Sequence, residues 1–193
     1  MSRTKAFQPE SALHSAMDLF WQKGYEATSM RDLLDAMSIG RGSFYDTFGN
    51  KHSLFLTALD RFEKTRTTWI IEALESPDPP LESIRYVFER TVDSLTSFEP
   101  RRGCLLANTA VELAPQDPEV AEKILAYIQR TENAFANALK RARQTREIPQ
   151  DRNPQSLACF LVSNLHGLRV MARAGADRQT LYQVVEVALS ALS

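Results

Sequence analysis

Residues 38–54 read SIGRGSFYDTFGNKHSL, and this stretch has an unusual composition. Its 17 residues include three of the chain's seven glycines, three aromatic residues and two widely spaced cations, but no acid–base pair and no cluster of metal ligands. Glycine permits tight turns and is common where helices end. The stretch therefore predicts a short helix between two breaks.

Two further helices are predicted before this stretch. The first ends at Gly24. The second begins at Ser29, because a serine followed three residues later by Asp32 is a capping pattern, in which the hydroxyl accepts a backbone N–H and the carboxylate favours the positive helix end. This second helix covers about residues 30–37.

The stretch itself encodes a turn, a third helix and the start of a fourth. Residues 38–40 predict a tight turn, and the third helix covers about residues 41–48. Residues 49–50 break it, and Lys51 opens a long helix toward Glu75. Two short helices joined by a tight turn and preceded by a third are the layout of a helix-turn-helix module, whose last helix enters the major groove of DNA.

The third helix carries residue types that suit contacts with DNA. Its two phenylalanines lie four residues apart, so they share one face and predict inward packing. Arg41 can donate to guanine O6 and N7, Gly42 lets the backbone approach the bases, and Tyr45 offers its ring to a thymine methyl group. Lys51 and the first-turn backbone N–H groups of the fourth helix predict a phosphate contact.

The run SMRDLLDAMSIGRGSFYDTFGNKHSLF, residues 29–55, resembles the N-terminal DNA-binding module of the TetR family of one-component transcriptional regulators. The resemblance covers roughly residues 10–56 and is weak beyond them. The family usually has glycine where this turn has Ser38, and a non-glycine residue at positive φ costs about 1 kcal/mol. The matching residues are, in order, Ser29, Leu33, Ile39, Gly42, Ser43, Phe44, Tyr45, Phe48, Lys51 and Leu54.

By position, the resemblance implies a role for eight residues in binding double-stranded operator DNA. The implied phosphate contacts come from Ser29, Ser43, Thr47 and Lys51, and the implied base-edge contacts come from Arg31, Arg41, Gly42 and Tyr45. In function, the resemblance implies a ligand-responsive regulator, most often a repressor.

Charge alone does not point to DNA. The net charge is −1, and positive and negative residues balance at six each across residues 1–51. Any DNA contact therefore depends on a local patch. The alternative is a helical metabolite-binding protein or enzyme whose first 50 residues pack as a plain subdomain. Arg3 and Lys5 form either an arm that reaches the minor groove or a disordered terminus.

The rest of the chain also predicts helices. Proline-rich breaks separate long proline-free stretches, in which apolar residues recur every three or four positions. No stretch alternates as a strand. We therefore predict an all-α fold with about nine helices, divided into a DNA-binding domain over residues 1–50 and an effector-binding and dimerisation domain over residues 51–193.

The last two predicted helices favour self-assembly. Residues 157–172 are apolar nearly all round, and residues 178–192 form an amphipathic helix beside them, so the pair suits a four-helix interface between two copies. Gly167, which has no side chain, would allow two helices to approach each other closely there. The resemblance implies the same homodimer on a near-palindromic operator, and the alternative is a buried core helix in a monomer.

A small-molecule effector site is predicted in the second domain, because polar residues stand among apolar ones there, as they do in ligand pockets. Each of these residues suits a core position equally well. Cys104 follows two arginines and a glycine, a setting that favours a thiolate, so it is either a thiol switch or a small buried hydrophobe. The predicted lining residues are Trp69, Phe88, Cys104, Asn108, Glu112, Tyr127 and Phe160.

Other function classes receive no support from the sequence. We expect no cofactor, no metal site and no enzyme activity, because neither metal-ligand spacing nor a nucleophile with its base is recognisable. The two cysteines, Cys104 and Cys159, are expected to be free thiols. No signal peptide or membrane span is recognisable, so a cytoplasmic location is expected. His166 is read as a core or interface histidine rather than a ligand contact.

Overall fold

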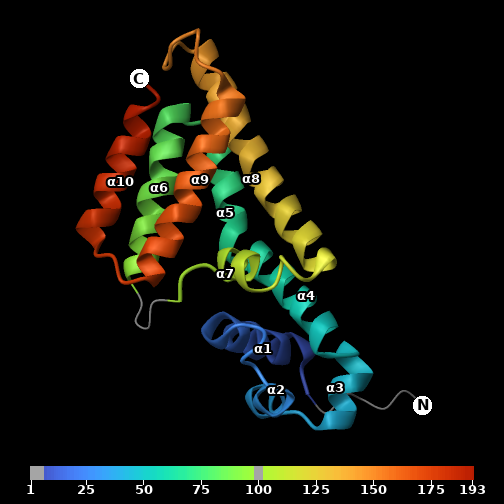
Figure 1. Ribbon diagram of the computed structural model, residues 1–193. Coiled ribbons are helices and arrows are strands. Elements are labelled where there is room, and N and C mark those ends of the chain that lie inside the picture. The colour runs from blue at the N-terminus through green and yellow to red at the C-terminus, as the bar shows by residue number, and fades with distance from the viewer. Residues whose placement is uncertain (1–6, 98–101) are drawn as a thin grey trace.

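The computed structural model describes residues 7–97 and 102–193, so Arg3 and Lys5 lie outside the described residues. All regular structure in the described part is helical (Figure 1). The elements are α1 (Pro9–Lys23), α2 (Met30–Met37), α3 (Arg41–Phe48), α4 (Lys51–Phe62), the π-helical η1 (Glu63–Thr67), α5 (Thr68–Leu74), α6 (Pro80–Thr96), α7 (Leu105–Glu112), α8 (Pro118–Gln144), α9 (Pro154–Arg173) and α10 (Arg178–Ser190). Because α4, η1 and α5 are continuous, the described residues contain nine helices, and the prediction of an all-α fold is confirmed.

The three-helix unit α1–α3, which we call the head, has the predicted helix-turn-helix layout. Phe20, Leu33, Phe44 and Leu54 are fully buried where α1, α2, α3 and the start of α4 meet. Removing such side chains from water drives the packing of these short helices, which would be marginal in isolation. The observed bounds of α2 and α3 agree with those predicted from the sequence.

Two local features fix the ends of α2. At its start, the Ser29 hydroxyl accepts the Asp32 N–H at 3.1 Å, and the Asp32 carboxylate accepts the Ser29 N–H at 3.0 Å, so the predicted capping box is confirmed. These bonds, together with Lys23, lower the pKa of Asp32 to about 2. At the other end, Ser38 takes the left-handed conformation with φ 53° and ψ 43°.

One long helix joins the head to the remaining helices, which we call the body. Figure 1 shows α4 rising from the head and continuing as α5 into the body. Between them, η1 closes with the Thr68 N–H donating to the carbonyl of Glu63, five residues back, and the hydroxyls of Thr67 and Thr68 donate to the same oxygen at 2.8 and 3.2 Å. π-helical turns inside α-helices are rare and are common at functional sites.

The body is built around α8 and α9, with α5, α6 and α10 packed beside them (Figure 1). Phe88 and Phe135 are fully buried there, with ring centroids 6.1 Å apart. The core of the head continues without a gap into α7 and the first half of α8, where Leu105, Val120 and Tyr127 are buried. None of the helices among the described residues is both long enough and apolar enough to cross a membrane.

Candidate functional site

The predicted DNA-contact residues lie on one end of the head, around α3. Six of the eight are exposed, and Thr47 and Lys51 are partly buried. Phe44 is fully buried beneath them and Phe48 is partly buried on the same face, so the opposite face of α3 points outward, as a helix that enters a groove requires. The exposed six are Ser29, Arg31, Arg41, Gly42, Ser43 and Tyr45.

The middle of α3 presents an aromatic ring beside an unobstructed backbone. Tyr45 is 47% exposed, and its ring meets the Phe44 ring edge-on with centroids 5.3 Å apart. A Cβ built at Gly42 would have no neighbouring atom within 4 Å. The backbone of α3 is therefore open to close approach at this position.

Two residues near the helix starts are held by local contacts. The Lys51 ammonium lies 4.2 Å from the centroid of the Tyr25 ring, a cation–π contact with the loop between α1 and α2. Asn50 caps this helix through a bond from the Ser53 N–H at 2.8 Å. By contrast, the Ser29 hydroxyl both donates to and accepts from Asp32, so its phosphate contact would have to compete with the capping box.

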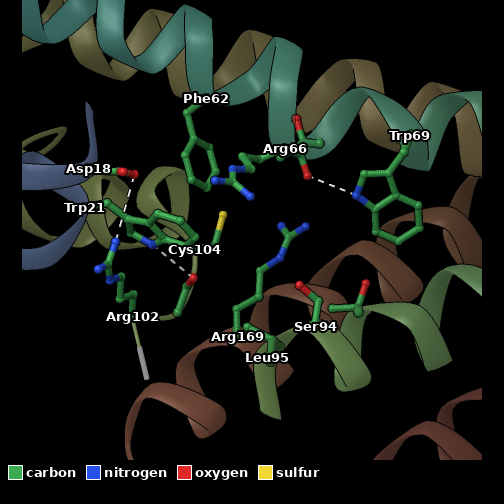
Figure 2. A pocket seen from close by; sticks show the side chains of 13 residues that line it. Asp18, Trp21, Phe62, Arg66, Trp69, Ser94, Leu95, Arg102, Cys104 and Arg169 are labelled. Atoms are coloured by element: carbon green, nitrogen blue, oxygen red, sulfur yellow. Dashed lines mark hydrogen bonds and ion pairs between the residues drawn. The ribbon is translucent and has the colours of Figure 1, made fainter. Parts of the chain in front are cut away.

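A second feature is a cavity of about 350 Å³ between the head and the body. Figure 2 shows its side chains converging from α1, from the long connecting helix, from α6, from the loop before α7 and from α9. The lining residues are Asp18, Trp21, Phe62, Arg66, Thr67, Trp69, Thr91, Ser94, Leu95, Arg102, Gly103, Cys104 and Arg169.

Aromatic rings and arginines form one wall of this cavity. The Trp21 ring packs edge-on against Phe62 with centroids 5.0 Å apart, and its indole N–H donates to the Gly103 carbonyl at 3.1 Å. The guanidinium groups of Arg66 and Arg102 lie 5.6 and 5.5 Å from the Trp21 ring centroid. Trp21 therefore links α1 of the head to the loop before α7, with the guanidinium groups of Arg66 and Arg102 beside its ring.

The opposite wall carries a buried charge. Arg169, on α9, is only 5% exposed, and its hydrogen bond to a protein group within the described residues is a long one to the Tyr127 hydroxyl, at 3.3 Å. An arginine stays protonated in proteins, so this charge is permanent.

On α1, Asp18 Oδ1 is buried with no hydrogen-bond partner among the described residues, and Arg102 lies 3.9 Å from it.

His166 lies one helical turn before Arg169. Burial and the nearby Arg169 charge lower the pKa of His166 to about 4, so its ring is neutral at pH 7. The ring meets the Tyr127 ring edge-on at 6.3 Å, and its Nε2 is buried without a partner among the described residues. His166 is only partly buried, so its reading as a core or interface histidine stays a prediction.

The structure brings only two of the predicted effector-site residues to the cavity, namely Trp69 and Cys104. Phe88 lies in the core of the body, and Phe160 is 42% exposed on α9. Tyr127 stands behind Arg169 rather than on the cavity wall.

The two polar residues predicted on α7 serve local contacts instead. Asn108 donates to the Arg102 carbonyl at 3.1 Å and so shapes the loop before the helix. Glu112 accepts the Glu26 N–H at 2.9 Å and thereby joins the body to the end of α1.

Sequence reasoning missed the charged part of the cavity. Arg169 is the one arginine or lysine within the apolar stretch 157–172, and that contrast was a usable signal, because a buried charge is costly unless something pairs with it. Trp21 and Arg66 gave no such signal, since each fits a surface or core position in its own helix.

Comparison with known proteins gives matches over both parts of the chain. Residues 12–58 match the family model described as "Bacterial regulatory proteins, tetR family", and residues 80–188 match "Tetracyclin repressor-like, C-terminal domain". Among curated proteins, the chain is 36% identical over 193 residues to the HTH-type transcriptional regulator YezE of Bacillus subtilis (strain 168), covering 100% of both. It is 31% identical over 188 residues to the HTH-type transcriptional repressor ComR of Escherichia coli (strain K12), covering 97% of this chain and 90% of ComR.

Among solved structures, a cysteine mutant of the TetR family transcriptional regulator CifR, complexed with 26-base-pair double-strand operator DNA, superposes with a TM-score of 0.90. It is 31% identical and covers 100% of both chains.

Proposed function

Because the chain belongs to the TetR family of bacterial regulatory proteins, we propose that it is a transcriptional repressor that binds a near-palindromic operator as a homodimer and releases it when a small molecule binds. The observation that supports this most directly is the outward face of α3, where Arg41, Gly42 and Tyr45 are exposed above the buried Phe44. The proposed setting is the bacterial cytoplasm, where operator DNA lies.

In this proposal the eight predicted DNA-contact residues divide into two groups. Arg41, Gly42 and Tyr45 contact base edges, joined by Arg31 at the start of α2, and these contacts select the sequence. Phosphate contacts from the serines and Thr47 fix the register, and Lys51 adds a charge beside the first turn of α4. Arg31 lies 3.8 Å from Asp35, a fully solvated pair that DNA can displace at little cost.

The dimer in this proposal forms through α9 and α10. Their outer faces carry large apolar side chains that the single chain leaves exposed: Phe160 is 42%, Val170 56% and Val187 70% exposed. A Cβ at Gly167 would meet no atom within 4 Å, so a second helix can approach there. A two-fold pair of this kind presents two copies of α3 to successive major grooves, about 34 to 36 Å apart.

Effector control in this proposal works through contacts between the head and the body. Besides the bond from Trp21 to Gly103, His52 of α4 lies 2.7 Å from Asp117 at the start of α8. A ligand in the cavity touches α1 on one side and α9 on the other. It shifts the population away from the DNA-binding arrangement only by as much as its affinities for the two arrangements differ.

The rival function, a helical metabolite-binding protein or enzyme, makes the opposite prediction for DNA. The test is binding of the full chain to a genomic fragment library, followed by titration of the selected fragments at several salt concentrations. A sequence-reading protein selects a defined motif and loses affinity steeply as salt rises. Absence of any selected motif would contradict the proposed function.

Two variants separate the roles of the contact residues. Lys51→Ala should weaken binding to all sequences alike and reduce the salt slope by about one, as expected for one lost phosphate contact. Arg41→Ala should relax the preference at one base position by about 1 to 3 kcal/mol. Lys140→Ala, which removes an exposed cation on α8, is the matched control and should leave both properties unchanged.

A further inference from the structure

We propose that the cavity between the head and the body binds a small organic anion, namely a carboxylate joined to an apolar group the size of one ring, and that this molecule is the effector. The inference rests on the proposed function for its regulatory consequence, but the binding itself does not require DNA.

The charges on the cavity wall favour an anionic ligand. Three arginines and one aspartate line the cavity, which leaves two positive charges in excess. Of the three arginines, Arg102 is the one within 4.0 Å of the Asp18 carboxylate, so Arg66 and Arg169 are the cations with no acidic side chain beside them on the wall. Figure 2 shows the guanidinium groups of Arg66 and Arg169 directed toward the interior from opposite sides. Such a cavity favours an anion over a neutral or cationic molecule.

Arg169 is the cation that most needs such a ligand, because it is buried and poorly paired. It has five N–H donors, but within the described residues its hydrogen bond goes to the Tyr127 hydroxyl, and no carboxylate lies within 4.0 Å of it there. Burying a charge without a partner is costly, and a carboxylate can accept two parallel bonds from a guanidinium. A bound carboxylate supplies the partner that the protein lacks.

The size and lining of the cavity favour an organic anion over an inorganic one. Trp21, Phe62, Trp69 and Leu95 give it an apolar wall, and about 350 Å³ is near the lower end of the range for small-molecule sites. Inorganic phosphate would satisfy the arginines but would leave the aromatic wall against water. The wall therefore favours an organic anion whose apolar part packs on Trp21 while its carboxylate reaches Arg169.

This placement also explains how such an anion would act on the head. Trp21 and Asp18 belong to α1, whereas Arg169 belongs to α9, so the ligand contacts both parts at once. Its affinity therefore depends on the angle between the head and the body, which is the condition for an effector.

The experiment is calorimetric titration of the full chain with benzoate, phenylacetate and hexanoate, each beside its neutral amide, with benzylamine and inorganic phosphate as further probes. At least one carboxylate should bind at least tenfold more tightly than its amide and more tightly than benzylamine or phosphate. Equal binding of acids and amides would overturn the proposal. So would binding of phosphate alone, or no carboxylate binding up to 10 mM.

Variants identify the site of binding. Arg169→Met should weaken carboxylate binding at least tenfold, and Arg66→Gln, at an exposed position, should weaken it at least threefold without depending on the fate of a buried charge. Arg85→Gln removes an exposed arginine of α6 outside the cavity and should leave carboxylate binding unchanged. Unchanged affinity in both Arg169→Met and Arg66→Gln would overturn the assignment.

Operator binding in the same samples separates this inference from the proposed function. If the operator is bound but no carboxylate binds, the cavity assignment fails and the repressor stands. If carboxylates bind but no DNA sequence is selected, the repressor fails and the anion site stands. Bound carboxylate that leaves operator affinity unchanged would overturn its role as the effector.

Discussion

Ser38 adopts φ 53° and ψ 43° in the turn between α2 and α3, so we expect Ser38→Gly to raise the free energy of unfolding. The left-handed conformation costs a residue with a Cβ about 1 to 2 kcal/mol. Glycine escapes this cost, but it loses more backbone entropy on folding, which offsets about 0.5 to 1 kcal/mol. The bond from the Ser38 N–H to the Asp35 carbonyl, 3.2 Å long, is a backbone bond and survives the substitution. The net gain is about 0.5 to 1 kcal/mol, or about 1 to 4 °C in melting temperature for a chain of this length.

Thermal unfolding followed by circular dichroism measures this gain. The protein concentration is held constant, because the melting temperature of a dimer depends on it. Ser43→Gly is the matched control: it makes the same change at an exposed helical position of α3, where glycine should cost about 0.5 to 1 kcal/mol. Arg146 is also left-handed, at φ 62°, and Arg146→Gly should stabilise the body in the same way. An unchanged or lower melting temperature for Ser38→Gly, with Ser43→Gly behaving as expected, would refute the strain argument.

His166 and Gly24 give two further predictions. The folded-state pKa of His166 is about 4, below the unfolded value of 6.5, so the unfolded chain binds the proton more readily. The free energy of unfolding therefore falls by up to about 3 kcal/mol as the pH drops from 6.5 to 4. His166→Phe should flatten this part of the stability profile in urea unfolding at pH 4.5 to 7.5, and an unchanged profile would exclude the histidine as its cause. At Gly24, where φ is 85°, an alanine Cβ would lie 2.7 Å from Glu112 Oε2, so Gly24→Ala should destabilise the chain by at least about 1 to 2 kcal/mol and displace Glu112 from the Glu26 N–H. Gly40→Ala has open space and an ordinary φ, so it should cost less than about 0.5 kcal/mol, and equal losses in the two variants would contradict the backbone strain and crowding at Gly24.

The head was predictable because its signals are local. The cap at Ser29, the turn at Ser38 and the breaks at Gly24 and Gly49 each depend on a few neighbouring residues, and the observed helix bounds follow them. Ser38 stands where the family usually has glycine, and it takes the left-handed conformation that makes this position a departure.

The cavity was not predictable in the same way. Its walls come from positions between Asp18 and Arg169, and their meeting depends on how five segments pack. Cys104 is the N-cap of α7, but the residues around it in the sequence could not say which neighbour covers each face of that helix. Glu112 accordingly faces the end of α1, while Asn108 holds the loop before its own helix.

The π-helical turn at residues 63–67 lets the connecting helix change its length by one residue with little reorientation of the head. A π turn holds one residue more than an α turn, so deleting one residue from this segment would restore the ordinary helical repeat and keep nearly the same rotation about the helix axis. The same deletion within α4 would instead turn the head by about 100° relative to the body and draw it closer by about 1.5 Å. In a dimer both heads would turn, so the two half-sites that they can reach together would change in spacing and in facing. The operator that the dimer can reach therefore depends on where along this helix a residue is gained or lost, with every DNA-contacting side chain retained.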